Sequence, residues 1–234
     1  MIEVISKPWG WEFTLLETAT VLVTYLHIRK GFSTSLHCHP KKRTGYVVLQ
    51  GSVDVEFLSN TRTLIAGEKI NFRAGLFHKT HALSQDSIIL EFESPPNKHD
   101  LLRMEDSFGR TGSAYESQPA PISENLYGQY QSYADKLGSY WAGESIIKVS
   151  NFSLSREKMS IPELLHSENP ETIVCLLDDA IHANEKYLSE EPGVIINSGD
   201  VTSIDILGRM ESILSLGGSY DFMMIKKIYS EFTI

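Results

Sequence analysis

The chain has 234 residues and a formal net charge of −9, and 41% of its residues are hydrophobic and 22% charged. This composition is typical of a soluble globular protein, and the acidic balance argues against binding to nucleic acid or to an anionic membrane. Two cysteines cannot form a disulfide framework and fit a reducing compartment. The N-terminus lacks a signal-peptide pattern, and no apolar run approaches the roughly 18 residues of a membrane span. We therefore expect a cytoplasmic protein.

The first 95 residues predict a series of short β-strands. These segments are apolar or alternating and are separated by glycine and polar breaks; they cover residues 19–28, 44–51, 52–58, 63–67, 69–75 and 87–93. No long segment repeats its apolar residues with the 3.6-residue period of a helix. Many short strands at close intervals are typical of an all-β sandwich or barrel.

The pattern changes after residue 94, where two consecutive prolines end the last strand because proline cannot donate to a sheet ladder. Residues 100–112 mix charged and apolar side chains, which indicates an irregular tail or a helical turn. Residues 113–139 are polar and indicate a linker, with a short helix capped by Ser123. We place a domain boundary in this segment.

Strand-like runs resume in the second half of the chain. They cover residues 145–154, 172–179, 193–199, 200–207, 211–217 and 220–229. Their order is similar to that of the first half, which suggests a second copy of the same β unit that has lost most of its histidines. We therefore predict a β domain over 1–112, a linker over 113–139 and a second β domain over 140–234.

Two histidines stand one residue apart in the segment SLHCHPKKRTGYVVLQG, residues 35–51. On a strand, residues i and i+2 project from the same face, roughly 7 Å apart, so His37 and His39 would point one way and Cys38 the other. Two imidazoles at that separation can converge on one cation, with bonds of about 2.0–2.1 Å to zinc. The pair alone is also compatible with two surface histidines beside a charged turn.

Glycines frame this pair and a third histidine, His78, in a way that resembles the two-part cupin signature. The two blocks are GFSTSLHCHPKKRTGYVVLQG, residues 31–51, and GEKINFRAGLFHKTHA, residues 67–82. The resemblance implies a cupin barrel, also called a double-stranded β-helix or jelly roll, in which His37, His39 and His78 meet at one divalent metal ion. Zinc is the first candidate, with manganese, iron, nickel and cobalt as alternatives. The resemblance also implies a homodimer, and the second β domain is then a degenerate cupin that makes the chain a bicupin.

Three positions depart from the cupin signature. Thr44 stands where the family usually has a metal-binding glutamate, Arg73 takes the proline position and Ala82 the asparagine position. Three neutral histidines can still hold a divalent metal and leave positions open for water or substrate. Loss of the carboxylate lowers the expected affinity, so a cupin that kept its histidines and lost its metal is the alternative.

The flanks of the first domain narrow the resemblance. KPWGWEF at residues 7–13 and DLLRMEDSFGRTG at residues 100–112 resemble the opening and closing blocks of the cupin domain in type II mannose-6-phosphate isomerases. The closing block keeps the residues Asp100, Arg103, Asp106, Gly109 and Arg110. This resemblance covers about residues 5–112 and implies a metal-dependent sugar-phosphate isomerase or epimerase. Such cupins also resemble proteins of bacterial surface-polysaccharide pathways, which suggests a sugar or sugar phosphate as the ligand.

Several cations and one acid are further candidates. Lys41 and Lys42 follow the histidines and predict either a phosphate clamp at the barrel mouth or a solvated turn. Arg73, close to the third histidine, is the stronger candidate for substrate binding because its guanidinium offers a bidentate fork for phosphate. Glu91 becomes a general base or a replacement metal ligand if it faces the barrel interior, where desolvation raises its pKa. The Tyr46 hydroxyl reaches the cavity if it follows the same alternation.

Two other functions share these residues. A non-haem iron dioxygenase would use the same three histidines with Fe(II) and oxygen. A non-catalytic sugar-binding cupin is favoured by Thr44 and by the histidine-poor second half. The predicted barrel does not distinguish among these functions, because the same fold supports many different reactions.

Overall fold

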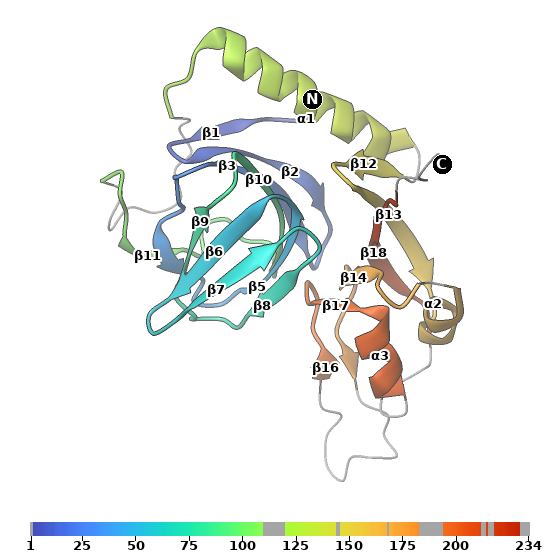
Figure 1. The fold of residues 1–234 in the computed structure, drawn as a ribbon. Coiled ribbons are helices and arrows are strands. Elements are labelled where there is room, and N and C mark those ends of the chain that lie inside the picture. Colours follow the sequence, from blue (N-terminus) through green and yellow to red (C-terminus); the bar gives the residue numbers. More distant parts are fainter. Residues whose placement is uncertain are drawn as a thin grey trace.

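The computed structural model describes residues 2–109, 120–143, 146–167, 169–182, 194–211, 214 and 218–229. The first half forms two antiparallel sheets that face each other as a barrel (Figure 1). The six-stranded sheet contains, in order, β1 (Ile5–Lys7), β2 (Gly10–Glu17), β3 (Leu22–Arg29), β10 (Asp86–Ser94), β5 (Arg43–Gln50) and β8 (Lys69–Phe72). The five-stranded sheet contains β11 (Leu102–Glu105), β4 (Leu36–Cys38), β9 (His78–Ala82), β6 (Ser52–Phe57) and β7 (Thr61–Ile65). The predicted all-β barrel is thereby confirmed.

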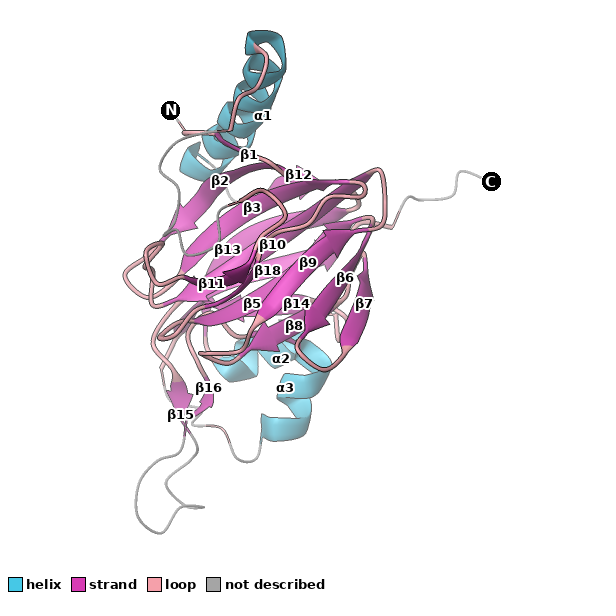
Figure 2. Ribbon diagram, turned by 90° about the vertical axis from the view of Figure 1, so that its left-hand side faces the viewer, coloured by secondary structure: helices cyan, strands magenta, loops and turns pink. Residues whose placement is uncertain are grey.

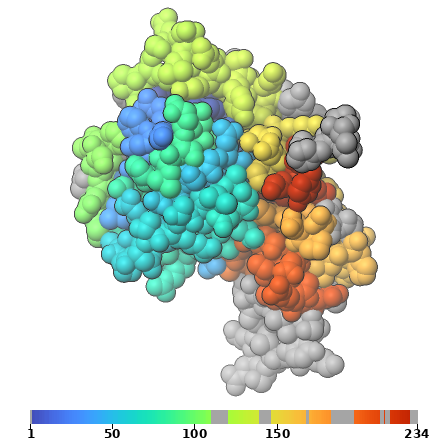
Figure 3. All heavy atoms as spheres, in the orientation of Figure 1, coloured from blue at the N-terminus to red at the C-terminus, as the bar shows by residue number. Residues whose placement is uncertain are grey.

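The second half adds a third layer on the outer side of the six-stranded sheet (Figures 1 and 3). This five-stranded sheet contains β12 (Ile147–Val149), β13 (Phe152–Met159), β18 (Tyr220–Lys227), β14 (Ile173–Leu176) and β17 (Val201–Ser203). A separate ribbon pairs β15 (Ile181–His182) with β16 (Val194–Ile196). The helices are α1 (Glu124–Gly143), α2 (Ile161–Ser167) and α3 (Ile204–Met210), and Figure 2 shows α1 at the end of the molecule opposite to α2 and α3.

The six-stranded sheet is buried on both faces, and this explains its unusually apolar strands. In β10, Ile89 packs inside the barrel with Val48 and Phe72. Its neighbour Leu90 packs outward against the third sheet, in the same cluster as Met223. A strand buried on both sides reads as a continuous apolar run rather than as an alternating one, as the segment SIILEF does.

Close backbone approach fixes the third sheet on the barrel. A Cβ at Gly45 would lie 2.9 Å from the carbonyl oxygen of Gly199, so only glycine fits at this position of β5. Next to it, Arg43 forms a 3.0 Å ion pair with Asp200. The two halves of the chain therefore share one large apolar core, and the Arg43–Asp200 ion pair links them at its edge.

Four local predictions need correction or completion. The helix after Ser123 runs for 20 residues rather than being short, and it packs on the barrel by stacking Tyr130 on Trp11 with centroids 4.6 Å apart. Residues 102–105 form an edge strand instead of a tail, because they pair with β4. Residues 204–207 belong to a helix rather than a strand. The described residues do not include Arg110, residues 113–119 or most of residues 211–217.

The bicupin prediction stays a prediction. Within the described part of residues 147–229, one face of the third sheet packs on the barrel. The opposite face is covered by α2 and α3, which contribute Leu164 and Leu207 to a cluster with Met224.

In the part of the chain that the structure describes, none of the helices is long and apolar enough to cross a membrane.

Candidate metal centre

Three imidazoles converge inside the barrel: His37 lies on β4, His39 directly follows that strand, and His78 begins β9. The ring centroids of His37 and His78 are 4.6 Å apart, those of His37 and His39 5.0 Å, and those of His39 and His78 5.7 Å. One nitrogen from each ring lies within 4.8 Å of those from the other two, and all three side chains are buried. The cluster could hold one metal ion.

The local fold explains why these rings meet. His37 on β4 and His78 on β9 are direct antiparallel partners, so their side chains leave the same face. The backbone N–H of Gly75 donates to the carbonyl of His39 at 2.8 Å and holds the chain after β4 against the turn before β9. Gly75 has φ +76°, a conformation that L side chains rarely adopt, which accounts for the glycine in the second block.

Each imidazole is oriented by a backbone carbonyl. The Nδ1 atoms lie 2.8 Å from the carbonyl oxygen of Ser35 for His37, 2.7 Å from that of Asp100 for His39 and 2.9 Å from that of Leu76 for His78. A carbonyl only accepts, so each Nδ1 carries the proton, and in a neutral ring the Nε2 lone pair is then available. Among the described residues, the buried Nε2 atoms of His39 and His78 have no hydrogen-bond partner. This donor set fits a divalent cation.

Burial keeps the three rings neutral. Desolvation lowers the pKa of His37 well below its ordinary value, with the neighbouring imidazoles acting in the same direction. Desolvation and the charge of Lys42 lower the pKa of His39 to about 3 and that of His78 to about 4. Because only a neutral imidazole binds a metal, the site is prepared for coordination at neutral pH.

A cavity of about 80 Å³ opens beside these histidines. Its wall combines basic, acidic and hydroxyl groups from both sheets; the lining residues include Lys7, Glu12, Lys42, Tyr46, Glu91, Glu93, Lys98 and Arg103. This mixture within an otherwise apolar barrel is typical of a ligand site rather than of a structural core.

Glu91 and Tyr46 face this cavity together. They are direct cross-strand partners on β10 and β5, and both side chains line the cavity. Desolvation, followed by the charge of Glu93, raises the pKa of Glu91 to about 8. Desolvation and the nearby Glu91 also raise the pKa of the Tyr46 hydroxyl. The structure therefore places both side chains at the cavity, an orientation that the sequence left open. Glu93, two residues after Glu91, also lines the cavity, and the sequence analysis gave it no role.

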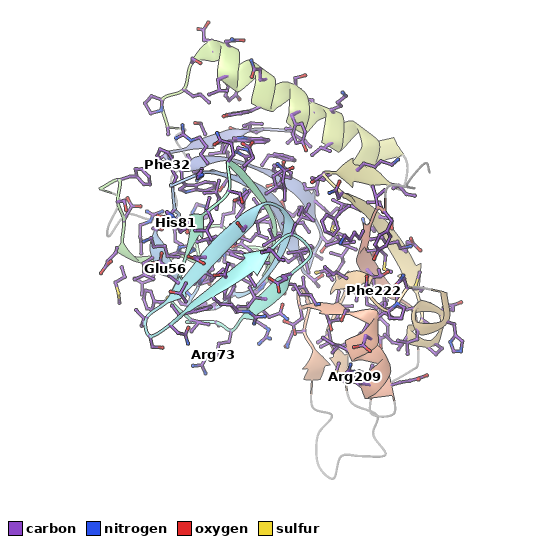
Figure 4. The ribbon with its side chains drawn as sticks, viewed as in Figure 1. Phe32, Glu56, Arg73, His81, Arg209 and Phe222 are labelled. Atoms are coloured by element: carbon purple, nitrogen blue, oxygen red, sulfur yellow. The ribbon has the colours of Figure 1, made fainter. Side chains whose placement is uncertain are left out.

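The three predicted cations lie in different places. Lys42 is buried, lines the cavity and forms an ion pair with Glu93. Lys41 is exposed, and its backbone N–H donates to the Asp100 carboxylate. Arg73 is exposed and points away from the barrel (Figure 4), so the structure does not bring it to the cavity. Of the three, only Lys42 is positioned to meet a ligand inside the barrel.

Two residues of the closing block support the centre in a way that sequence reasoning missed. The backbone carbonyl of Asp100 accepts from His39, and its carboxylate accepts the backbone N–H of Lys42 at 2.9 Å. Arg103 is buried beside His37 as its direct partner on β11, and its Nε donates to the Ser35 hydroxyl at 3.1 Å. The charged pattern of residues 100–112 singled out both residues, but only the pairing of β11 with β4 shows where their side chains lie.

The lowered histidine pKa values predict that the metal-free protein is sensitive to acid. Below pH 6.5 the unfolded chain protonates His37, His39 and His78 while the folded chain does not, so stability falls as the pH falls. The raised pKa values of Glu91 and Glu93 act in the opposite direction over part of this range. Because three histidines oppose two carboxyl groups, the unfolded state keeps a net excess of bound protons, which grows as the pH falls from 6 to 5.

Each net proton corresponds to about 1.4 kcal/mol per pH unit. We therefore expect the free energy of unfolding, measured in urea with chelator present, to drop by about 1 kcal/mol between pH 6 and pH 5. His166→Gln, a change at an exposed histidine of α2, should leave this slope unchanged. A stability that is constant or rises over this interval would contradict the buried, neutral state of the three rings.

Several solved structures are similar to part of this chain. KdgF from Halomonas sp. is 21% identical with a TM-score of 0.39, over 41% of this chain and 89% of that chain. A cupin-2 domain protein from Shewanella frigidimarina is 19% identical with a TM-score of 0.34, over 39% and 84%. The capsular polysaccharide assembling protein CapF from Staphylococcus aureus is 16% identical with a TM-score of 0.40, over 45% and 32%. These likenesses concern the fold. No protein-family model and no curated protein matches the chain.

Proposed function

We propose that the protein is a metal-dependent isomerase or epimerase that acts on a sugar or sugar phosphate. The observation that carries this proposal is the position of a half-buried acid, Glu91, and its cross-strand neighbour Tyr46 in the cavity that His37 and His39, two of the three neutral imidazoles, also line. Metal binding alone needs only the imidazoles. A carboxyl group whose pKa lies near neutrality is what proton transfer between carbon atoms requires.

The proposed chemistry divides between the cation and the chain. A divalent cation held by His37, His39 and His78 would polarise a substrate carbonyl and the hydroxyl on the next carbon. Glu91, as carboxylate, removes the proton from the hydroxyl-bearing carbon beside the carbonyl, which leaves an enediolate. The proton of the neighbouring hydroxyl passes to the former carbonyl oxygen, and Glu91, now protonated, returns its proton to the neighbouring carbon. A pKa of about 8 makes both forms of Glu91 available near neutral pH.

Cations in the cavity wall favour an anionic substrate. Arg103 stands beside His37 and Lys98 also lines the cavity, and a guanidinium can hold phosphate or carboxylate oxygens in a bidentate manner. These two residues replace Arg73 as the candidates for phosphate binding. The resemblance of residues 5–112 to type II mannose-6-phosphate isomerases supports a sugar phosphate as this anion.

Incubation of the metal-loaded protein with hexose, pentose and heptose phosphates in D₂O tests the proposal. We expect one of these substrates to isomerise or epimerise and to acquire deuterium at a carbon next to the carbonyl, as seen by NMR. Absence of both isomerisation and exchange across the panel would contradict it. Oxygen consumption by the Fe(II)-loaded protein would instead indicate a dioxygenase.

A non-catalytic sugar-binding cupin is the second candidate. Thr44 favours it, because a hydroxyl replaces the usual carboxylate ligand, and so does the ion pair of Lys42 with Glu93, which places a positive charge near the histidines. A sugar phosphate that protects the protein against thermal unfolding without turnover would identify this function.

A further inference from the structure

Glu93 occupies the position from which the carboxylate missing at Thr44 can be replaced. The two residues are direct antiparallel partners on β10 and β5, so both side chains leave the same face with Cβ atoms about 4.5–5.5 Å apart. Glu93 is buried, and its Oε1 lies 3.7 Å from the Nε2 of His39. The short side chain of Thr44, whose Oγ1 is buried without a hydrogen-bond partner among the described residues, does not fill the space that a glutamate would take.

Glu93 and Glu91 have different surroundings, and these separate their roles. Both carboxylates lie within 4.8 Å of a His39 nitrogen and of each other. Glu91 stands opposite Tyr46 on the neighbouring strand, whereas Glu93 carries the ion pair with the buried Lys42. Desolvation and the charge of Glu93 raise the pKa of Glu91 and so favour its neutral form. The carboxylate of Glu93 faces the positive charge of Lys42. A metal cation bound nearby would stabilise the same ionised carboxylate.

We propose that Glu93 is the fourth protein ligand of the metal centre, with its carboxylate shared between Lys42 in the metal-free protein and the cation in the loaded one. The carboxylate ligand has moved from the first motif to the adjacent strand, and Lys42 competes with the metal for it. Lys42 also repels a cation directly, because its charge acts on both His39 and His78. This inference rests on the metal centre of the proposed function and assigns its carboxylate.

Two variants isolate the contribution of the Glu93 carboxylate. Lys42→Met removes the competing ammonium group, and Lys42→Met/Glu93→Gln also replaces the carboxylate by a neutral amide of the same shape. Comparing these two avoids leaving Lys42 buried without its partner, which would be costly for folding. Circular dichroism and thermal unfolding of both metal-free proteins establish that they are folded.

Zinc affinity is measured by competition with a chromophoric chelator. We expect Lys42→Met to bind zinc at least as tightly as the wild type, and the double variant to bind at least about tenfold more weakly than Lys42→Met. Adding Thr44→Glu to the double variant should restore the affinity, because it returns a carboxylate to the same face. Equal affinities of Lys42→Met and the double variant would overturn the proposal.

The control His78→Ala distinguishes this failure from failure of the centre itself. If His78→Ala weakens zinc binding while the double variant binds zinc as tightly as Lys42→Met, the three-histidine site stands and only the role of Glu93 is lost. If the wild type does not bind zinc, cobalt or manganese, both proposals fail. A crystal structure of the zinc-loaded wild type needs no variant: we expect a Glu93 oxygen about 2.0–2.2 Å from the metal, and a Glu93 that remains on Lys42 alone would contradict the assignment.

Discussion

We expect His78→Ala to abolish the thermal stabilisation that zinc gives the wild-type protein. A ligand that binds only the folded state stabilises it by about 4 kcal/mol when its free concentration is 1,000 times its dissociation constant. For a chain of this size that corresponds to a rise in Tm of about 8–16 °C. His78 supplies one of three converging imidazoles, and its Nε2 is buried without a partner among the described residues. Its loss should weaken zinc binding at least about a hundredfold.

The matched control for this change lies on the same strand. His81 follows His78 by three residues on β9, is half-buried and does not belong to the histidine cluster (Figure 4). His81→Ala should therefore keep the full zinc-induced rise in Tm. The relevant quantity is the shift between chelator and zinc for each variant, because removal of the His78 ring, which stacks on Phe72 at 4.3 Å, also lowers the stability of the metal-free protein. An unchanged shift in His78→Ala would contradict the proposed centre.

The glycines of the two blocks were readable from the sequence for a physical reason. Gly31, Gly51, Gly67 and Gly75 all have positive φ, between +73° and +94°. L residues avoid this region, so a regular spacing of glycines marks the turns that frame the strands. At Gly51 a Cβ would also lie 2.7 Å from the carbonyl oxygen of Asp86. When the turns are located, the alternation of side chains along each strand predicts that His37 and His78 project from the same face of the sheet.

The positions of the basic residues show that motif spacing alone does not predict which of their side chains reach the cavity. A motif gives the position of a residue along the chain, whereas alternation decides the direction of its side chain. Phe72 points into the barrel and stacks on His78, so Arg73, the next residue, points outward. Thr44 faces inward, so Lys42, two residues earlier, does too. Arg103 depended on a strand pairing that no local pattern indicates.

The second half was harder to predict because its apolar runs are short. Residues 200–207, DVTSIDIL, contain β-branched residues and were interpreted as one strand, but the strand ends at Ser203 and α3 begins at Ile204. Short apolar runs do not distinguish a strand from a buried helix by periodicity. Here tertiary packing decides, because Ile204 and Leu207 belong to the cluster on the outer face of the third sheet.

We expect Glu91→Gln to lower kcat on the substrate of the proposed reaction by about 10²–10⁴-fold, the usual contribution of a positioned proton-transfer group. Glutamine keeps the shape of glutamate, but it cannot take or return a proton. Deuterium uptake from D₂O into the substrate, followed by NMR, should fall in parallel. Zinc affinity should be unchanged, because the proposed ligands are His37, His39, His78 and Glu93.

The same change should not destabilise the fold, and this separates a catalytic role from a structural one. Because burial raises the pKa of Glu91 to about 8, ionisation of this carboxyl opposes folding as the pH rises from its unfolded value through 8. A neutral amide removes this cost, so the stability of Glu91→Gln relative to the wild type should increase steadily between pH 5 and pH 8 and stay constant above that. Glu56→Gln, at a half-exposed glutamate paired with Lys79, should change neither turnover nor this pH dependence. Unimpaired turnover in Glu91→Gln would remove Glu91 from the mechanism. Loss of both stability and turnover would mean that the carboxyl group serves the fold.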